Sequence, residues 1–199
     1  MSKEKLRRSM RAARRALSDA ERRRAALELC RHLAASSWYR DSSTLAAYLA
    51  ADGEIDLQPL IDEARRHGKR VCLPVVAAGP ALRFAVFEHD TPLNPNRHGI
   101  AEPAGTGVEL VAPRELDLVL APLVAFDPRG HRIGMGAGFY DRTFAFLNER
   151  PKPERPLLIG AAYELQRAPA IEAEPWDVPL SGIATEQGIY GLQPGAGTS

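Results

Sequence analysis

The residues best suited to chemistry lie in one segment, Asp117 to Leu147, which reads DLVLAPLVAFDPRGHRIGMGAGFYDRTFAFL. Three glycines alternate at Gly134, Gly136 and Gly138, and Asp141 follows them. Backbone with so little side chain lets a ligand approach closely and exposes N–H groups that can bind anions. We expect a helix to begin just after this loop and to add the positive end of its dipole. The segment therefore indicates a phosphate site, with Asp141 placed where a metal ion could bind.

The glycine-rich loop matches neither of the two common nucleotide motifs. No Gly-Lys-Ser/Thr follows it, as a P-loop requires, and its spacing differs from the GxGxxG dinucleotide fingerprint. A tight turn between a strand and a helix explains the glycines equally well. Asp141 has a similar alternative, as an acid favoured in the first turn of a helix. As a ligand it would suit Mg²⁺, which takes one or two carboxylates together with phosphate oxygens.

Three further side chains are candidates for binding. Asp177 lies in a loop near the C-terminus and is a second possible metal ligand or a surface acid. Arg132 precedes the glycine loop, where it could pair with a phosphate or lie on the surface. Glu54 follows a predicted strand, at the carboxyl end where α/β sheets bind ligands. Its carboxylate could accept hydrogen bonds from an amino-substituted ring, or it could be a solvated loop residue.

No protein nucleophile or metal cluster is apparent in the sequence. The five histidines are scattered without metal-ligand spacing, and no Ser-His-Asp or Cys-His set can be recognised. The two cysteines, Cys30 and Cys72, predict neither a disulfide framework nor a zinc site. The candidate residues therefore favour binding and charge stabilisation over covalent catalysis.

The N-terminal region is strongly basic, with ten Lys or Arg and three Asp or Glu in its first 24 residues, although the whole chain carries a net charge of +1. Residues 3–17 predict a helix with a narrow apolar stripe. Lys3, Arg7 and Arg14 lie within about 40° of one another on it, at about 100° per residue. Such a helix could dock by its apolar edge and direct cations at a neighbouring site, or it could be a solvated basic face. An RNA-binding arm is a third interpretation, which is weakened because no aromatic residues interleave for stacking.

The elements that must position these residues alternate between helices and strands. Ser18 to Glu21 has the form of a capping box and predicts the start of a second helix. The remaining predicted elements are a helix over 57–67 and strands over 44–50, 69–76, 82–88, 116–126, 156–163 and 183–190. The strand–helix–strand order predicts a parallel sheet. The connection over 89–114 is rich in Pro, Gly and Asn, and its length favours a functional role.

Length and composition predict one globular α/β domain over residues 1–199. Hydrophobic residues make up 45% of the 199 residues and charged residues 26%, as expected for a packed chain. No apolar run reaches the roughly 18 residues that a membrane span needs, and no signal peptide is visible. We therefore expect a cytoplasmic protein without a membrane partner.

Taken together, these pieces resemble the 5-formyltetrahydrofolate cyclo-ligase family, also called 5,10-methenyltetrahydrofolate synthetases, over nearly the whole chain. The matching motifs are Lys3-x-x-Leu6-Arg7, Asp52-Gly53-Glu54-Ile55-Asp56, Gly99-Ile100-Ala101-Glu102-Pro103, the block from Pro122 to Arg142, and Trp176-Asp177-Val178-Pro179-Leu180. The block from PLVAFD to GFYDR is highly specific, and the other motifs occur in the matching order. The resemblance implies a three-layer α/β domain with a mostly parallel sheet, similar to the ribose-5-phosphate isomerase and CoA-transferase group.

The resemblance also implies a reaction, in which 5-formyltetrahydrofolate is closed to 5,10-methenyltetrahydrofolate while ATP becomes ADP and phosphate with Mg²⁺. The γ-phosphate would pass to the formyl oxygen, and N10 would then attack the resulting iminium phosphate. Phosphoryl transfer depends on positioning and charge stabilisation rather than on a protein nucleophile. The partners implied are the folate and ATP, with no nucleic acid, and we expect a monomer.

The resemblance assigns roles to residues by motif. Those expected at ATP are Lys3, Arg7, Arg132, Ile133, Gly134, Met135, Gly136, Ala137, Gly138, Phe139 and Tyr140. Those expected at the folate are Leu49, Glu54, Met135, Gly136, Ala137, Gly138 and Phe139. Asp141 and Asp177 are expected to hold Mg²⁺.

Two other functions remain as alternatives at this point. A non-catalytic nucleic-acid-binding protein would use the basic N-terminal helix, but it leaves the glycine-rich block unexplained. An isomerase-like enzyme on the same fold would act on a sugar phosphate without ATP, and fold alone does not settle function. The basic helix together with both aspartates argues against it.

Overall fold

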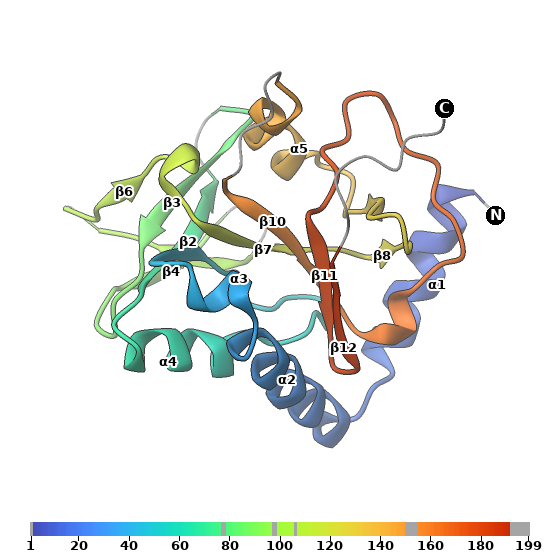
Figure 1. Ribbon diagram of the computed structural model, residues 1–199, viewed down its shortest axis with the longest axis horizontal. Helices are drawn as coiled ribbons and strands as arrows, with labels where there is room; N and C mark the ends of the chain where they lie inside the picture. The colour runs from blue at the N-terminus through green and yellow to red at the C-terminus, as the bar shows by residue number, and fades with distance from the viewer. Residues whose placement is uncertain (1, 77–78, 97–98, 106, 150–154, 192–199) are drawn as a thin grey trace.

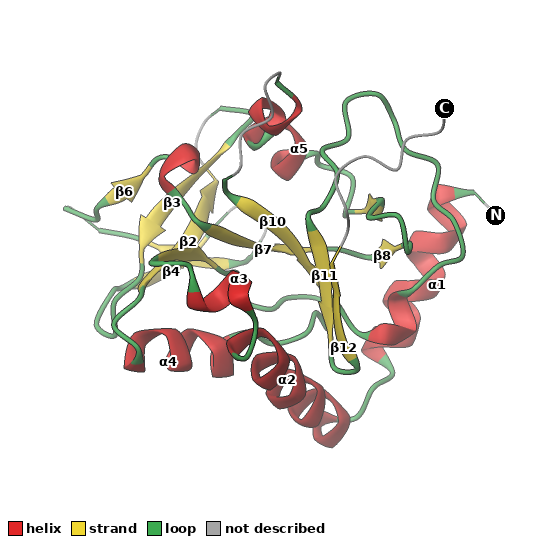
Figure 2. Ribbon diagram, viewed as in Figure 1, coloured by secondary structure: helices red, strands yellow, loops and turns green. Residues whose placement is uncertain are grey.

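The computed structural model describes residues 2–76, 79–96, 99–105, 107–149 and 155–191. A large twisted sheet runs through the centre of the molecule, with helices on both of its faces (Figures 1 and 2). The structure therefore has the three layers and the mostly parallel central sheet that the sequence predicts.

The central sheet has eight strands. They are β1 (Thr44–Ala46), β2 (Arg70–Val76), β3 (Leu82–Val86), β6 (Leu110–Val111), β7 (Leu118–Pro122), β10 (Leu157–Ala161), β11 (Gly182–Thr185) and β12 (Gly188–Gly191). Their order is β12-β11-β10-β7-β1-β2-β3-β6. The five strands from β11 to β2 are parallel, and antiparallel strands extend the sheet at both edges.

Helices and short hairpins surround this sheet. The helices are α1 (Lys3–Arg15), α2 (Asp19–Ala34), α3 (Ser37–Arg40), α4 (Gln58–Arg66) and α5 (Phe139–Thr143), with 3₁₀ turns at Pro113–Glu115, Ala145–Asn148 and Glu164–Gln166. The hairpins pair β4 (Leu93–Pro95) with β5 (Ala101–Pro103), and β8 (Ala125–Phe126) with β9 (Arg132–Ile133). In Figure 1, α2 and α4 lie along one face of the sheet, α5 lies on the other, and α1 lies at one end beside β8.

The core forms on both faces of the sheet because its central strands β7 and β10 are apolar at every position. In β7, Leu118 and Leu120 pack on the face covered by α2 and α4. Val119 and Ala121 point to the other face and pack in the cluster that contains Phe144. Successive side chains of a strand point to opposite faces, so a continuous apolar run is required where both faces are covered.

The predicted capping box is present, since the N–H of Ser18 donates to Glu21 at 2.8 Å and the N–H of Glu21 donates back to the Ser18 hydroxyl at 3.3 Å. Several predicted boundaries, in contrast, differ from the structure. The predicted strand over 116–126 is two strands, β7 and β8, in different sheets. The predicted strand over 183–190 is the antiparallel pair β11 and β12. The predicted strand over 44–50 ends at Ala46, and α3 and the β4–β5 hairpin were not predicted.

A membrane span was not expected from the sequence. Among the described residues, no helix combines the length and the apolar character that crossing a bilayer requires.

Candidate active site

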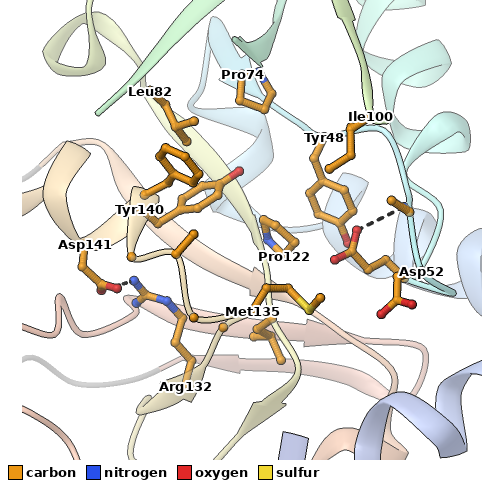
Figure 3. A pocket seen from close by; sticks show the side chains of 18 of the residues that line it. Tyr48, Asp52, Pro74, Leu82, Ile100, Pro122, Arg132, Met135, Tyr140 and Asp141 are labelled. Carbon is orange, nitrogen blue, oxygen red and sulfur yellow. Dashed lines mark hydrogen bonds and ion pairs between the residues drawn. The ribbon is translucent and has the colours of Figure 1, made fainter. Parts of the chain in front are cut away.

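One cavity of about 780 Å³ opens at the carboxyl ends of β1, β2 and β7. All residues that the sequence assigns to ATP, folate or metal line this cavity, although they come from α1, the loop after β1, the glycine loop and the loop before β11. Figure 3 shows Arg132 with Asp141 on one side of the cavity and Tyr48 with Asp52 on the other, with Met135 between them. The cavity therefore brings a cation and carboxylate cluster to one end and an aromatic and carboxylate cluster to the other.

Helix α1 presents two of the predicted cations to the cavity. Ser2 caps the helix by accepting a hydrogen bond from the N–H of Lys5 at 3.3 Å. The Lys3 ammonium pairs with Glu174 at 2.8 Å, and Nε of Arg7 donates to the carbonyl of Gly134 at 2.9 Å. The interpretation of α1 as a helix that directs cations at a neighbouring site fits this geometry better than a solvated basic face.

The glycine loop after β9 is held by arginines at both ends. Arg7 binds Gly134, and the Arg142 guanidinium donates to the carbonyl of Ala137 at 2.5 Å. Gly138 has φ +63°, a left-handed conformation that favours glycine, and a Cβ there would lie 2.8 Å from the end of the Arg142 side chain. A Cβ at Gly136 would meet nothing within 4 Å. This open backbone allows the close ligand approach that an anion site needs.

A helix begins directly after this loop, as predicted, but it is short. Helix α5 has five residues and continues into a 3₁₀ turn. A helix of little more than one turn has a small dipole, so its N-terminus alone would contribute little to phosphate binding. The open N–H groups of the loop and the nearby cations are better suited to bind an anion.

Asp141 and Asp177 both face Arg132. The Arg132 guanidinium donates to Asp141 Oδ1 at 2.5 Å and to the carbonyl of Val178, and its side chain is only 8% exposed. Burial lowers the pKa of Arg132, whereas the carboxylates of Asp141 and Asp177 raise it. Oδ1 of Asp141 also accepts the N–H of Val178 at 3.2 Å, which joins the two loops.

This pair of carboxylates fits Mg²⁺ better than a metal held by protein ligands alone. Among the described residues, no group of three or more His, Cys, Asp or Glu side chains could hold a metal. Mg²⁺ is commonly bound by one or two carboxylates together with substrate phosphates and water. Asp141 and Asp177, next to an open glycine loop, are a donor set of this kind.

Asp127 organises the hairpin that carries Arg132. Its carboxylate is 0% exposed and accepts hydrogen bonds from the N–H groups of Arg129 (2.9 Å), His131 (3.0 Å) and Ile171 (3.0 Å). Burial raises the pKa of this carboxyl, but the hydrogen bonds from Ile171, His131 and Arg129 lower it more, so the pKa lies below its usual value. The Asp of the PLVAFD motif is therefore a structural anchor of the site.

We expect Asp127→Asn to lower the free energy of unfolding by about 2–4 kcal/mol, because the amide turns donors toward N–H groups that need an acceptor. The depressed pKa means that the stability contributed by Asp127 is present above about pH 4 and is lost as the pH falls through the folded-state pKa. Urea unfolding between pH 3 and 7 would measure both effects. Equal stability of the variant and the wild type across this range would contradict the anchoring role.

Glu54 lies in a different environment, at the other end of the cavity. It follows the turn at Asp52, which has φ +54°, and its Oε2 accepts the N–H of Ala51 at 3.1 Å. Burial raises the pKa of Glu54, and the nearby Arg14 lowers it. The hydroxyl of Tyr48 lies in the same part of the cavity and donates to the carbonyl of Ile55 at 3.1 Å. A mostly buried carboxylate beside an aromatic ring is suited to a planar ligand with N–H donors.

Several cavity residues were not predicted from the sequence. They are Arg11, Tyr48, Ala51, Asp52, Leu73, Pro74, Val76, Leu82, Asn96, Gly99, Ile100, Ala101, Pro122, Leu123, Glu174 and Trp176. Two of these residues had a signal in the sequence. Asp52 belongs to an Asp-Gly dipeptide, which is typical of a turn, and Trp176 directly precedes Asp177, a predicted metal ligand. The β4–β5 hairpin contributes Asn96 and Ile100, so the long connection over 89–114 does take part in the cavity. Its residues 97, 98 and 106 lie outside the described residues, and so does part of the predicted loop from Arg97 to Pro103.

Comparisons with known proteins point to one family. The profile of the 5-formyltetrahydrofolate cyclo-ligase family matches residues 1–186. A 5-formyltetrahydrofolate cyclo-ligase of Escherichia coli is 38% identical over 74% of this chain and 80% of its own length, and one of Haemophilus influenzae is 40% identical over 72% and 76%. The solved structure of Aquifex aeolicus 5,10-methenyltetrahydrofolate synthetase is similar with a TM-score of 0.82 at 31% identity, covering 100% of this chain and 97% of that one. A 5,10-methenyltetrahydrofolate synthetase from Mycoplasma pneumoniae has a TM-score of 0.73 at 26% identity, with 94% and 99% covered.

Proposed function

Since the chain belongs to the 5-formyltetrahydrofolate cyclo-ligase family and is an enzyme of that class, we propose that its cavity closes 5-formyltetrahydrofolate to 5,10-methenyltetrahydrofolate with ATP and Mg²⁺. The observation that carries this proposal is the arrangement of the cavity itself. A glycine-rich loop with cations and two carboxylates lies at one end, and the mostly buried Glu54 carboxylate lies at the other, in the same part of the cavity as Tyr48. A nucleotide triphosphate and a pterin could therefore meet over the glycine loop.

The proposed chemistry proceeds in two steps with a balanced exchange of groups. The formyl oxygen attacks the γ-phosphorus of ATP, the bond to the β-phosphate oxygen breaks, and ADP leaves. N10 of the folate then attacks the activated formyl carbon and loses its proton, and the carbon–oxygen bond breaks to release inorganic phosphate. Neither step requires a covalent bond to the protein, which agrees with a cavity built for positioning and charge stabilisation.

The proposed nucleotide end comprises Lys3, Arg7, Arg132 and the glycine loop. Lys3 and Arg7 reach this end from α1 and would bind phosphate oxygens. Asp141 and Asp177 would hold Mg²⁺, which would supply positive charge to the phosphate end of the cavity. Arg132 lies beside both carboxylates and would remain a second positive charge at the same place.

The proposed folate end is formed by Glu54, Leu49 and the loop from Met135 to Phe139. The Glu54 carboxylate would accept hydrogen bonds from the N–H groups of the pterin ring. Met135 is exposed at the cavity, and its flexible side chain is suited to contact a ring. This arrangement would leave the formyl group of the substrate near the glycine loop, where the γ-phosphate would lie.

The basic N-terminal helix is better explained by this enzyme than by a nucleic-acid-binding protein. Three of its arginines, Arg11, Arg14 and Arg15, pair with the carboxylate of Asp52. Cations that are neutralised within the protein add little to the binding of a polyanion. The enzyme also accounts for the glycine loop, which the alternative leaves without a role.

The proposal is tested by an absorbance assay. Protein, (6S)-5-formyltetrahydrofolate and Mg²⁺ are mixed, ATP is added, and the near-ultraviolet band of the methenyl product is followed at neutral pH. We expect the band to grow only when ATP and Mg²⁺ are both present, with one ADP formed for each product molecule. Addition of EDTA in excess over Mg²⁺ should stop the reaction, and restoring Mg²⁺ should restart it.

Two outcomes would contradict separate parts of the proposal. Formation of product without release of ADP would contradict the role of ATP. A rate that is unchanged in EDTA would contradict the role of Mg²⁺ while leaving the cyclisation in place.

A further inference from the structure

Arg14 is a fully enclosed charged side chain near the cavity, at 0% exposure. Its Nε donates to the carbonyl of Asp52 at 2.9 Å, and its Nη2 donates to the carboxylate of the same residue at 2.9 Å. Its Nη1 donates to the carbonyl of Leu123 at 3.1 Å, just beyond β7. Nη2 also lies 3.6 Å from Oε1 of Glu54. One guanidinium therefore joins α1, the turn after β1 and the end of β7 around the Glu54 carboxylate.

The two carboxylates next to Arg14 differ in their other partners. Asp52 also pairs with Arg11 at 2.7 Å and with Arg15, so it keeps two cations if Arg14 is removed. Among the described residues, Glu54 forms an ion pair with Arg14 alone. The loss of Arg14 would therefore leave Asp52 partnered and Glu54 without a cation.

We propose that Arg14 is a positioning residue for the folate site, which holds the Glu54 carboxylate in the place and direction that the pterin ring requires. This inference rests on the proposed function, because it assumes that Glu54 binds the pterin. Arg14 does not line the cavity, so it would act on the substrate only through Glu54.

The electrostatic surroundings of Glu54 support this role. Burial raises the pKa of Glu54, and Arg14 is the cation that opposes the rise, helped by the N–H of Ala51. Three phenols also lie beside Glu54. Tyr48 and Tyr140 have pKa values raised first by burial and then by the Glu54 charge, and the Tyr163 hydroxyl donates to the Glu54 carbonyl at 3.4 Å. None of these phenols supplies a positive charge. Removal of Arg14 should therefore make Glu54 take up a proton at a higher pH.

The test compares Arg14→Met and Arg14→Lys with Arg15→Gln as the matched control. Arg15 lies next in α1 and binds the same Asp52 carboxylate, but it is 55% exposed and forms no ion pair with Glu54 among the described residues. Dissociation constants for (6S)-5-formyltetrahydrofolate and for Mg-ATP are measured separately by calorimetry, well below the melting temperature of each variant. We expect Arg14→Met to weaken folate binding by at least about tenfold and Arg14→Lys by about threefold, with Mg-ATP affinity within about twofold of wild type. Arg15→Gln should keep the affinities for folate and for Mg-ATP within about twofold of the wild-type values.

Two readouts separate positioning from a merely structural role. In Arg14→Met, the low-pH loss of folate affinity should move to higher pH, because Glu54 loses the charge that keeps it ionised. In a Glu54→Gln background, Arg14→Met should weaken folate binding by less than about a further twofold, because Arg14 acts on the folate only through Glu54. If Arg14 had only a structural role, the pH dependence of folate binding would not shift. The double variant would then bind folate more weakly than Glu54→Gln alone. If Arg14→Met fails to fold, Arg14→Gln replaces it in both measurements, because glutamine also removes the positive charge beside Glu54.

The outcomes also separate this inference from the proposed function. Wild-type folate affinity in both Arg14 variants, or an equal loss of folate and Mg-ATP affinity, would overturn the positioning role and leave the enzyme assignment intact. Failure of the wild-type protein to bind (6S)-5-formyltetrahydrofolate would overturn the proposed function itself.

Discussion

Asp141→Asn is expected to lower kcat/KM by about 1,000-fold, or about 4 kcal/mol of transition-state stabilisation, while the protein remains folded. The amide keeps an oxygen that can accept the N–H of Val178, and Arg132 keeps its bond to the carbonyl of Val178. The variant therefore loses a negative metal ligand with little change in packing. The methenyl absorbance assay measures the activity, and thermal unfolding measures the stability.

A second measurement ties this loss to the metal. In the wild type, ATP should bind more tightly with Mg²⁺ than without it, and Asp141→Asn should lose most of that difference. Asp62→Asn is the matched control, because Asp62 is an exposed acid of α4 outside the cavity and contacts Gln58. Wild-type activity in Asp141→Asn would contradict the metal assignment. An unchanged effect of Mg²⁺ on the ATP affinity of this variant would also contradict it.

Glu54→Gln is expected to weaken the binding of (6S)-5-formyltetrahydrofolate by about 100-fold, which corresponds to about 2.7 kcal/mol, with Mg-ATP affinity nearly unchanged. A carboxylate can accept two N–H groups of the pterin, whereas an amide accepts with one oxygen and presents donors with its nitrogen. Calorimetry with each ligand alone measures the two affinities. Glu28→Gln, which removes an exposed acid paired with Arg31 on α2, is the matched control.

The pH dependence of folate binding provides a further check on Glu54. Since burial raises its pKa, the wild type should lose folate affinity as the pH falls through that pKa, when the carboxylate takes up a proton. The Gln variant has no proton to gain, so its weaker affinity should stay flat over the same range. A wild-type pH profile in Glu54→Gln would assign the titration, and with it the pterin contact, to another group.

The sequence predicted the order of the elements better than their ends. Strands and helices alternate in the predicted order because each apolar run has its own turn signals, as at Gly68 after α4. The run over 116–126 was read as one strand because every residue after Asp117 in it is apolar, whether the chain continues straight or bends. Periodicity does not report that β7 and β8 belong to different sheets. The reversal between β11 and β12 at Glu186 and Gln187 was missed for a different reason, since the polar pair followed by Gly188 is a turn signal that was not used.

The site could be predicted where a motif holds its residues close in sequence. The glycine loop and Asp141 belong to one block, and Arg132 precedes it directly. Arg14 was recognised only as one of three cations on a helix face, because its partners Asp52 and Leu123 are 38 and 109 residues away in the chain. Its burial follows from the way α1 packs against two loops, and local patterns carry no information on such packing.

The two tryptophans of this chain differ in their surroundings, and this gives the protein a built-in optical label. Trp176 is 67% exposed at the cavity, whereas the ring of Trp38 is packed so closely on Gly182 that a Cβ there would lie 2.3 Å from it. The long-wavelength emission and its quenching by iodide should therefore come mainly from Trp176. Occupancy of the cavity can then be followed by fluorescence in the unmodified protein, with the partly buried Trp38 as the internal reference.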